Sequence, residues 1–170
     1  GADLTPLDLS EGLVVPLGGA ARYAFAADEE AEAAQAFAHA WPNLAQQTVT
    51  NGEGTPRWLL FEARAHPEPA TPMRVRLEDG TQLVGVTLEP ASVAPGQAPV
   101  LTLFWKAAGP IPAEYTQFLH VIEEDGAGVA QHDKQQPGNK YPTARWRLGD
   151  IVADWFRLTI RDGDSLLEVG

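Results

Sequence analysis

The chain has 170 residues, of which 44% are hydrophobic, so it is long and apolar enough to form one generous domain or two small ones. Its 23 acidic residues outnumber its 12 Lys and Arg residues, and the net charge of -11 argues against a nucleic-acid partner, because such a surface does not neutralise phosphates. The absence of cysteine excludes disulfides and cysteine-based zinc sites, and no apolar run approaches the roughly 18 residues of a membrane span, so we expect no direct membrane insertion.

Residues 1–65 are predicted to form a small α/β subdomain with the element order ββαββ. Four short segments have the composition of strands: residues 13–17, 22–26, 45–50 and 57–63. Between the second and third of these, a group of carboxylates precedes apolar residues at three- and four-residue spacing. This pattern predicts one helix, which ends at Pro42.

The rest of the chain is predicted to be an antiparallel β-sandwich, immunoglobulin-like or jelly-roll-like, over residues 73–170. A proline-rich connector at residues 66–72 separates it from the first part. About seven short segments alternate with turns in the manner of such sandwiches. These segments are residues 73–77, 81–88, 100–106, 115–123, 129–133, 151–160 and 166–169. The predicted fold class is therefore mainly β, with one helix in the first part.

Two histidines on neighbouring predicted strands raise the question of a metal site. If the hairpin is centred on Gly126, His120 lies opposite His132, whereas a register that differs by one residue pairs His120 with Gln131. The neighbouring Asp133 points to the other face in either case, so a third ligand is missing. The favoured interpretation is two histidines on a partly solvated sheet face, and we expect neither a metal nor a cofactor.

Carboxylates and aromatic residues also gather around the loop that follows this hairpin. Asp133, Asp150 and Asp154 are near Tyr141 and Trp146 in the sequence, and aromatic rings of this kind stack on sugars. The favoured role of the carboxylates is to brace the loop by accepting backbone hydrogen bonds. Contact with a sugar is the second interpretation, and cleavage of a glycosidic bond by paired carboxylates is the least favoured.

The tryptophans are predicted to differ in their access to a ligand. Trp105 alternates with Phe104 in a strand that is apolar on both faces, which indicates a core position. Trp146 lies in a loop between two arginines and is the one with an open route to a ligand.

A series of short motifs in the second part carries a family resemblance. These motifs are Phe104-Trp105, Tyr115 to His120, Ala130 to Asp133, Pro137-Gly138, Tyr141 to Trp146, Gly149-Asp150 and Asp154. The series resembles the soluble region that follows the transmembrane helices in some bacterial membrane glycosyltransferases of the dolichyl-phosphate-mannose protein mannosyltransferase type, which is glycosyltransferase family 39-like.

The resemblance implies an accessory domain on the extracytoplasmic side of the cytoplasmic membrane. In such proteins the catalytic residues belong to the membrane-embedded region of the same protein, so this chain by itself is not expected to be an enzyme. The expected partners are that membrane region and a carbohydrate or protein acceptor. The candidate ligand-binding residues are Tyr141, Trp146, Asp133 and Asp154, and the two aspartates are also expected to hold the loop of the aromatic residues in shape. The alternatives are a structural spacer and, less favoured, a glycosidase that uses Asp133 and Asp154.

Overall fold

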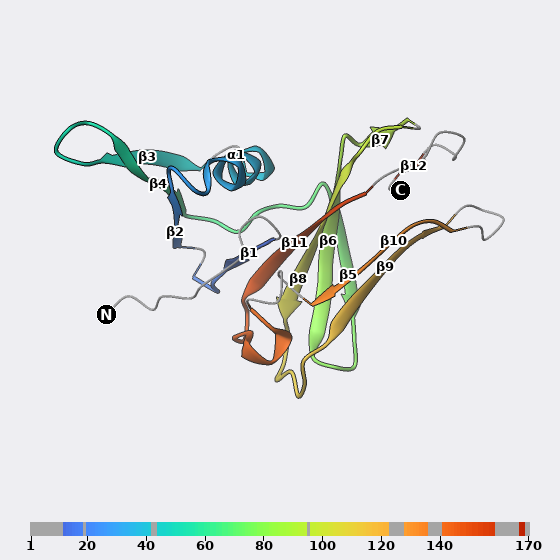
Figure 1. Cartoon of the computed structure of the whole chain (residues 1–170). Coiled ribbons are helices and arrows are strands. Elements are labelled where there is room, and N and C mark those ends of the chain that lie inside the picture. Colours follow the sequence, from blue (N-terminus) through green and yellow to red (C-terminus); the bar gives the residue numbers. More distant parts are fainter. Residues whose placement is uncertain are drawn as a thin grey trace. The chain divides into compact units, whose positions relative to one another are not determined.

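The computed structural model of the protein describes residues 12–18, 20–41, 44–94, 96–122, 128–135, 141–158 and 167–168 (Figure 1). The chain divides into a larger compact unit, residues 1–14 with 68–170, and a smaller one, residues 15–67. Every strand pair with an assigned register is antiparallel. The predicted class, a mainly β chain with antiparallel sheets, is therefore confirmed.

The larger unit is built on a five-stranded sheet with the order β1-β11-β8-β6-β5. Its strands are β1 (Gly12–Val15), β5 (Thr71–Arg76), β6 (Thr81–Glu89), β8 (Val100–Ala107) and β11 (Ile151–Arg157). The sequence pattern assigns the first strand to the smaller α/β part, whereas the structure places it at the edge of this sheet. Leu13 and Val15 are 2% and 0% exposed, so the apolar side chains of β1 gain burial there.

The first residue of β5 also differs from the prediction, because the strand begins two residues earlier, at Thr71. Thr71 and Pro72 were expected to belong to the connector, but they pair with Val86 and Gly85 of β6. Pro72 can take this place because β5 is an edge strand, where the missing backbone N–H leaves no neighbour unpaired.

Two further pairs of strands complete the described part of the larger unit. They are β9 (Thr116–Ile122) with β10 (Gly128–Gln135), and β7 (Ser92–Val93) with β12 (Leu167–Glu168); the short helix η1 spans Thr143–Arg145. Leu119 and Val121 of β9 pack against the buried cluster on the sheet. The β9–β10 hairpin therefore forms a second layer over the sheet, as in a β-sandwich.

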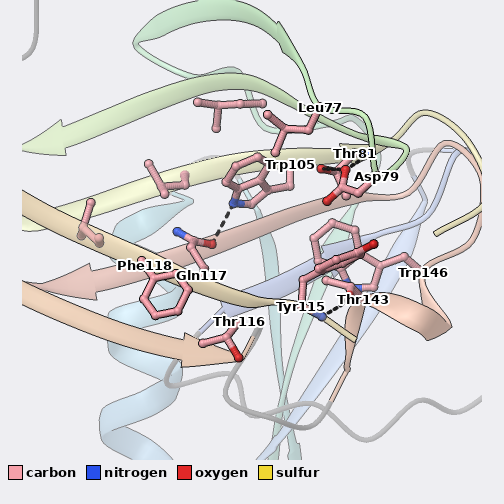
Figure 2. Close-up of a pocket in the computed structure, with 13 residues that line it drawn as sticks. Leu77, Asp79, Thr81, Trp105, Tyr115, Thr116, Gln117, Phe118, Thr143 and Trp146 are labelled. Atoms are coloured by element: carbon pink, nitrogen blue, oxygen red, sulfur yellow. Dashed lines mark hydrogen bonds between the residues drawn. The ribbon is translucent and has the colours of Figure 1, made fainter. Parts of the chain in front are cut away.

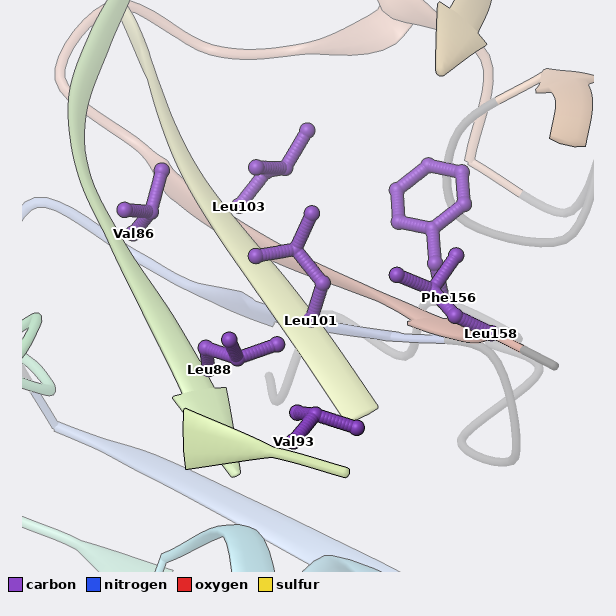
Figure 3. Packing of buried hydrophobic residues seen from close by; sticks show 7 residues of the cluster. All are labelled: Val86, Leu88, Val93, Leu101, Leu103, Phe156 and Leu158. Carbon is purple, nitrogen blue, oxygen red and sulfur yellow. The ribbon is translucent and has the colours of Figure 1, made fainter. Parts of the chain in front are cut away.

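The core between these layers is aliphatic, with one phenylalanine. Figure 3 shows its buried members, which are Val86, Leu88, Val93, Leu101, Leu103, Phe156 and Leu158. Phe156 and Val93 have no exposed surface at all. Full burial of such a side chain stabilises the fold by roughly 1.5–3 kcal/mol. This cluster therefore contributes much of the stability that holds the two layers together.

The smaller unit has a three-stranded sheet with the order β2-β4-β3 and one helix. Its elements are β2 (Ala21–Ala26), α1 (Ala31–Ala40), β3 (Ala45–Thr50) and β4 (Pro56–Ala63). Phe37 of α1 packs its ring 5.3 Å from that of Phe25 and 5.2 Å from that of Phe61. Neither α1 nor η1, the helices of the described residues, has the length and apolar character needed to cross a membrane.

Gly85 allows β5 and the segment before it to approach β6 closely. A Cβ atom at this position would collide with the ring of Pro69 and lie 2.8 Å from the carbonyl oxygen of Thr71. The register of β6 also shifts between Leu83 and Gly85 in its pairing with β8. The absence of a side chain is thus a packing requirement at this point of the larger unit.

We predict that Gly85→Ala lowers the free energy of unfolding of the larger unit by about 1–3 kcal/mol, because backbone and a proline ring must move to admit the methyl group. Urea-induced unfolding followed by near-ultraviolet circular dichroism measures this loss. Gly109→Ala is the matched control in the same unit, because its added Cβ would meet its nearest atom at 3.7 Å, an ordinary contact. Equal losses of unfolding free energy in the two variants would contradict the conclusion that close packing requires glycine at position 85.

Candidate functional site

A pocket of about 500 Å³ opens in the larger unit between the β5–β6 turn, β8 and the beginning of β9 (Figure 2). Its volume lies within the range of about 300–1,000 Å³ that is common for small-molecule sites. The lining residues are Leu77, Asp79, Thr81, Leu83, Leu103, Trp105, Tyr115, Thr116, Gln117, Phe118, Leu119, Thr143 and Trp146. Aromatic rings and polar groups are combined in this lining, which is the composition of a binding site for a ligand with both apolar and polar surfaces.

The two-residue period of the strands explains why these side chains converge. Leu103 and Trp105 are two residues apart on β8 and share a face, and Leu83 of β6 lies opposite Trp105 in the register. On β9, Gln117 and Leu119 are partly buried while the residues between them are exposed. The pocket therefore lies where the inward face of β9 meets the same face of the sheet as Trp105.

Trp105 presents a half-buried indole to this pocket. Its Nε1 donates a hydrogen bond of 3.1 Å to Oε1 of Gln117, which fixes the ring orientation from the opposite layer. Trp105 packs against both buried clusters, in keeping with the predicted core position, but its indole is only partly buried, whereas Phe104, which points to the other face, is buried. In the sequence, Gln117 was the residue that could have indicated this contact, because a polar residue on the inward face of an apolar strand needs a hydrogen-bond partner.

Asp79 also lines the pocket and was not among the candidate site residues predicted from the sequence. Its Oδ1 accepts hydrogen bonds from the backbone N–H of Thr81 at 2.8 Å and from the Thr81 hydroxyl at 2.7 Å. Gly80 between them has a φ of +91°, and a Cβ there would lie 2.7 Å from the carbonyl oxygen of Pro110. Glycine is required here for both reasons, so the turn holds the Asp79 carboxylate in one orientation.

The loop after β10 contains the predicted ligand-contacting residues, and the structure buries both of them. Tyr141 is 6% exposed and Trp146 is 8% exposed. Trp146 Nε1 donates to the carbonyl oxygen of Tyr141 at 3.0 Å, and the Tyr141 hydroxyl lies 2.9 Å from the carbonyl oxygen of Arg145. Both residues pack in a cluster with Ala107 and Val152. They are core residues of the loop, and Trp146 reaches the pocket as part of its wall.

The bracing of this loop falls to Asp150 and Thr143. Oδ2 of Asp150 accepts a hydrogen bond of 3.0 Å from the backbone N–H of Arg147 and lies 3.0 Å from the Tyr141 hydroxyl. The Thr143 hydroxyl accepts a bond of 2.9 Å from the backbone N–H of Tyr115 and donates one of 3.0 Å to the carbonyl oxygen of Ala113. The predicted mechanism of carboxylate bracing thus operates at Asp150, and Thr143 was missed because an isolated threonine carries no signal in the sequence.

The aspartates that the sequence analysis selected lie elsewhere. Asp154 has 0% exposure on β11, opposite Leu103, so it does not contact the pocket. Asp133 lies on β10 opposite Phe118, and its side chain is outside the described residues. Asp154 is not among the residues that line the pocket.

The hairpin has the register that separates the two histidines. His120 is paired with Gln131, and His132 with Leu119, so the histidines are not cross-strand partners. Within the part of the chain that the structure describes, no three acidic or histidine side chains gather as a metal site would require.

Burial and the neighbouring carboxylate of Asp150 raise the pKa of Tyr141 from its usual 10.0 to about 12, against a smaller opposing effect of Arg147. The protonated hydroxyl is the form that the fold favours. The stabilisation is therefore complete below the unfolded pKa of 10.0 and is lost as the pH rises toward about 12.

We predict that Tyr141→Phe lowers the free energy of unfolding at neutral pH by about 1–2 kcal/mol, because a buried hydroxyl loses its acceptors. The difference from the unmodified protein should shrink between about pH 10 and about pH 12, because the stabilisation by the protonated tyrosine is lost between the unfolded and the folded pKa. Urea unfolding at several pH values checks this. Tyr115→Phe, which removes the hydroxyl of a half-buried tyrosine, serves as the control. If the difference in unfolding free energy between Tyr141→Phe and the unmodified protein stayed constant with pH, folding would not be coupled to the ionisation of Tyr141.

No family model, curated protein or solved structure matches this chain. Its function is therefore argued from the pocket and from the motif series of the second part.

Proposed function

We propose that this chain is a non-catalytic, extracytoplasmic accessory domain of a membrane glycosyltransferase-like protein, and that it holds or orients a glycan acceptor. The observation that carries the proposal is the half-buried indole of Trp105, held by Gln117 in a pocket that also contains Tyr115 and Asp79. The resemblance of the motif series to the soluble regions of family 39-like enzymes supports the membrane and extracytoplasmic part of the proposal.

The pocket suits a sugar ring because the two sides of a pyranose differ in polarity. The C–H groups of one face stack on an aromatic ring, and the Trp105 indole is fixed by its hydrogen bond without any cost at the moment of binding. The hydroxyls at the ring edge then find acceptors such as the Asp79 carboxylate. A dissociation constant in the millimolar range, about -4 kcal/mol, is expected for one sugar unit.

Binding without hydrolysis is the favoured chemistry at this pocket. A glycosidase of the usual kind needs two carboxyl groups roughly 5–10 Å apart on either side of the bond. Among the described residues that line the pocket, Asp79 is the single carboxylate. The alternative pair, Asp133 and Asp154, is disfavoured because Asp154 has no exposed surface with which to reach a substrate.

A structural spacer remains the second candidate, and one observation favours it. Tyr141, Thr143, Trp146 and Asp150, which lie in the motifs that carry the resemblance, are all engaged in internal hydrogen bonds. For these four residues, a role in folding is a sufficient explanation of their presence in the motifs. The spacer hypothesis predicts that substitutions in the pocket change stability and leave every ligand measurement unchanged.

We predict that Trp105→Leu weakens binding of uncharged methyl hexopyranosides about tenfold, since an aromatic platform contributes on the order of 1 kcal/mol beyond its area. Isothermal titration calorimetry with a panel of these glycosides measures the change. Trp58→Leu is the control, because Trp58 is 48% exposed on β4 and lies outside the pocket. Thermal unfolding verifies that both variants are folded.

Because Trp105 also packs against both apolar clusters, the unmodified protein provides a second measurement. In a nuclear magnetic resonance titration, the amide shifts that change on sugar addition should map to residues 77–83, 103–105 and 115–119. If no glycoside of the panel binds, or if the unmodified protein and a folded Trp105→Leu variant have equal affinities, glycan binding at Trp105 is refuted and the spacer hypothesis is favoured.

A further inference from the structure

Asp79 offers the pocket one oxygen that the fold does not use. Both of its recorded hydrogen bonds, from the N–H and the hydroxyl of Thr81, end on Oδ1. Within the described part of the chain, Oδ2 accepts no hydrogen bond. Figure 2 shows the Asp79–Thr81 pair to one side of the Trp105 indole and Gln117 to the other.

An ionised carboxylate accepts hydrogen bonds and donates none, so the ligand atom that meets Oδ2 must carry a proton. A sugar hydroxyl satisfies this requirement. A phosphate or carboxylate oxygen brings no proton and carries the same charge, which makes its approach unfavourable in a partly desolvated site. The end of the pocket at Asp79 therefore distinguishes ligands by their charge.

From this chemistry we infer that the pocket takes an uncharged pyranose residue of a glycan, and that Asp79 is its specificity-determining residue, which selects against sugars with a phosphate or carboxylate at that end. The inference rests on the proposed glycan binding and deepens it. Thr81 is a positioning residue in this arrangement: it is 4% exposed, and its two hydrogen bonds aim the carboxylate.

Preorganisation of the turn is what makes this selection effective. Gly80 cannot be replaced without a clash with Pro110, and the carbonyl oxygen of Gly80 accepts a hydrogen bond of 2.9 Å from the N–H of Ala108. The carboxylate is thus tied to the segment after β8. Because it cannot swing away easily, an anionic ligand cannot escape the repulsion by displacing it.

The competing occupant is an apolar peptide segment, which could fill the volume between Leu77 and Leu103. Such a segment would leave Oδ2 of Asp79 without a donor in a buried interface, which costs roughly 1–3 kcal/mol or more for a charged group. A hydroxyl-bearing ring avoids this cost, and it is the occupant to which the inference commits.

The test uses three probes of one ring type: a methyl hexopyranoside, its 6-phosphate and the corresponding methyl hexuronoside. Calorimetric titration of the unmodified chain should show the uncharged glycoside binding at least tenfold more tightly than either anionic sugar. Asp79→Asn removes the negative charge and adds an N–H donor, so it should bring the three affinities within about threefold of one another.

Glu78→Gln is the matched control, because Glu78 is an exposed carboxylate in the same turn that does not line the pocket. It changes the net charge by the same amount and should keep the tenfold preference. If the anionic sugars bind the unmodified chain as tightly as the uncharged one, or if Asp79→Asn keeps the preference, the selection by Asp79 is refuted while glycan binding stands. If no sugar binds, or if an apolar peptide binds in their place, the proposed function fails as well.

Discussion

The Thr143 hydroxyl holds together the two segments on which the pocket depends. It accepts a hydrogen bond from the backbone N–H of Tyr115 and donates one to the carbonyl oxygen of Ala113, and its own residue begins η1 in the loop of Trp146. With only 2% of its surface exposed, this group works in a site where water does not compete. The bond to Tyr115 fixes the chain two residues before Gln117, which accepts the hydrogen bond of the Trp105 indole.

Two sets of residues with separate tasks follow from this arrangement. The motif residues Tyr141, Trp146 and Asp150 form hydrogen bonds with one another inside the loop, so their polar groups stabilise the loop conformation. The groups that face the pocket, above all Trp105 and Asp79, come from the sheet and from a glycine-dependent turn. A binding site on rigid strands and a turn of fixed conformation has the preorganisation that a weak sugar ligand needs.

The sequence pattern was sufficient for the β class and for most strand positions, because alternation and turn residues are local signals. It could not assign β1 to the larger sheet, since any exposed edge accepts an apolar strand. It left the register of His120 open, because a shift of one residue preserves the composition of both strands. The burial of Tyr141 and the partial exposure of the Trp105 indole depend on which layer faces which, and that is decided by long-range packing. Asp79 could not be selected as a site residue from the sequence, because most of its neighbours in the pocket are distant in the chain.

In the proposed binding mode, a sugar ring lies against the Trp105 indole. Isotope-filtered nuclear Overhauser spectroscopy of the chain with a methyl hexopyranoside tests it most directly, because these signals require protons within roughly 5 Å of each other, a separation that stacked rings satisfy. If the sugar stacks on Trp105, we expect contacts from the C–H protons of the sugar to the indole protons of Trp105 and to the ring of Tyr115. Contacts confined to the exposed Trp58, or none at a sugar concentration that saturates binding, would contradict it.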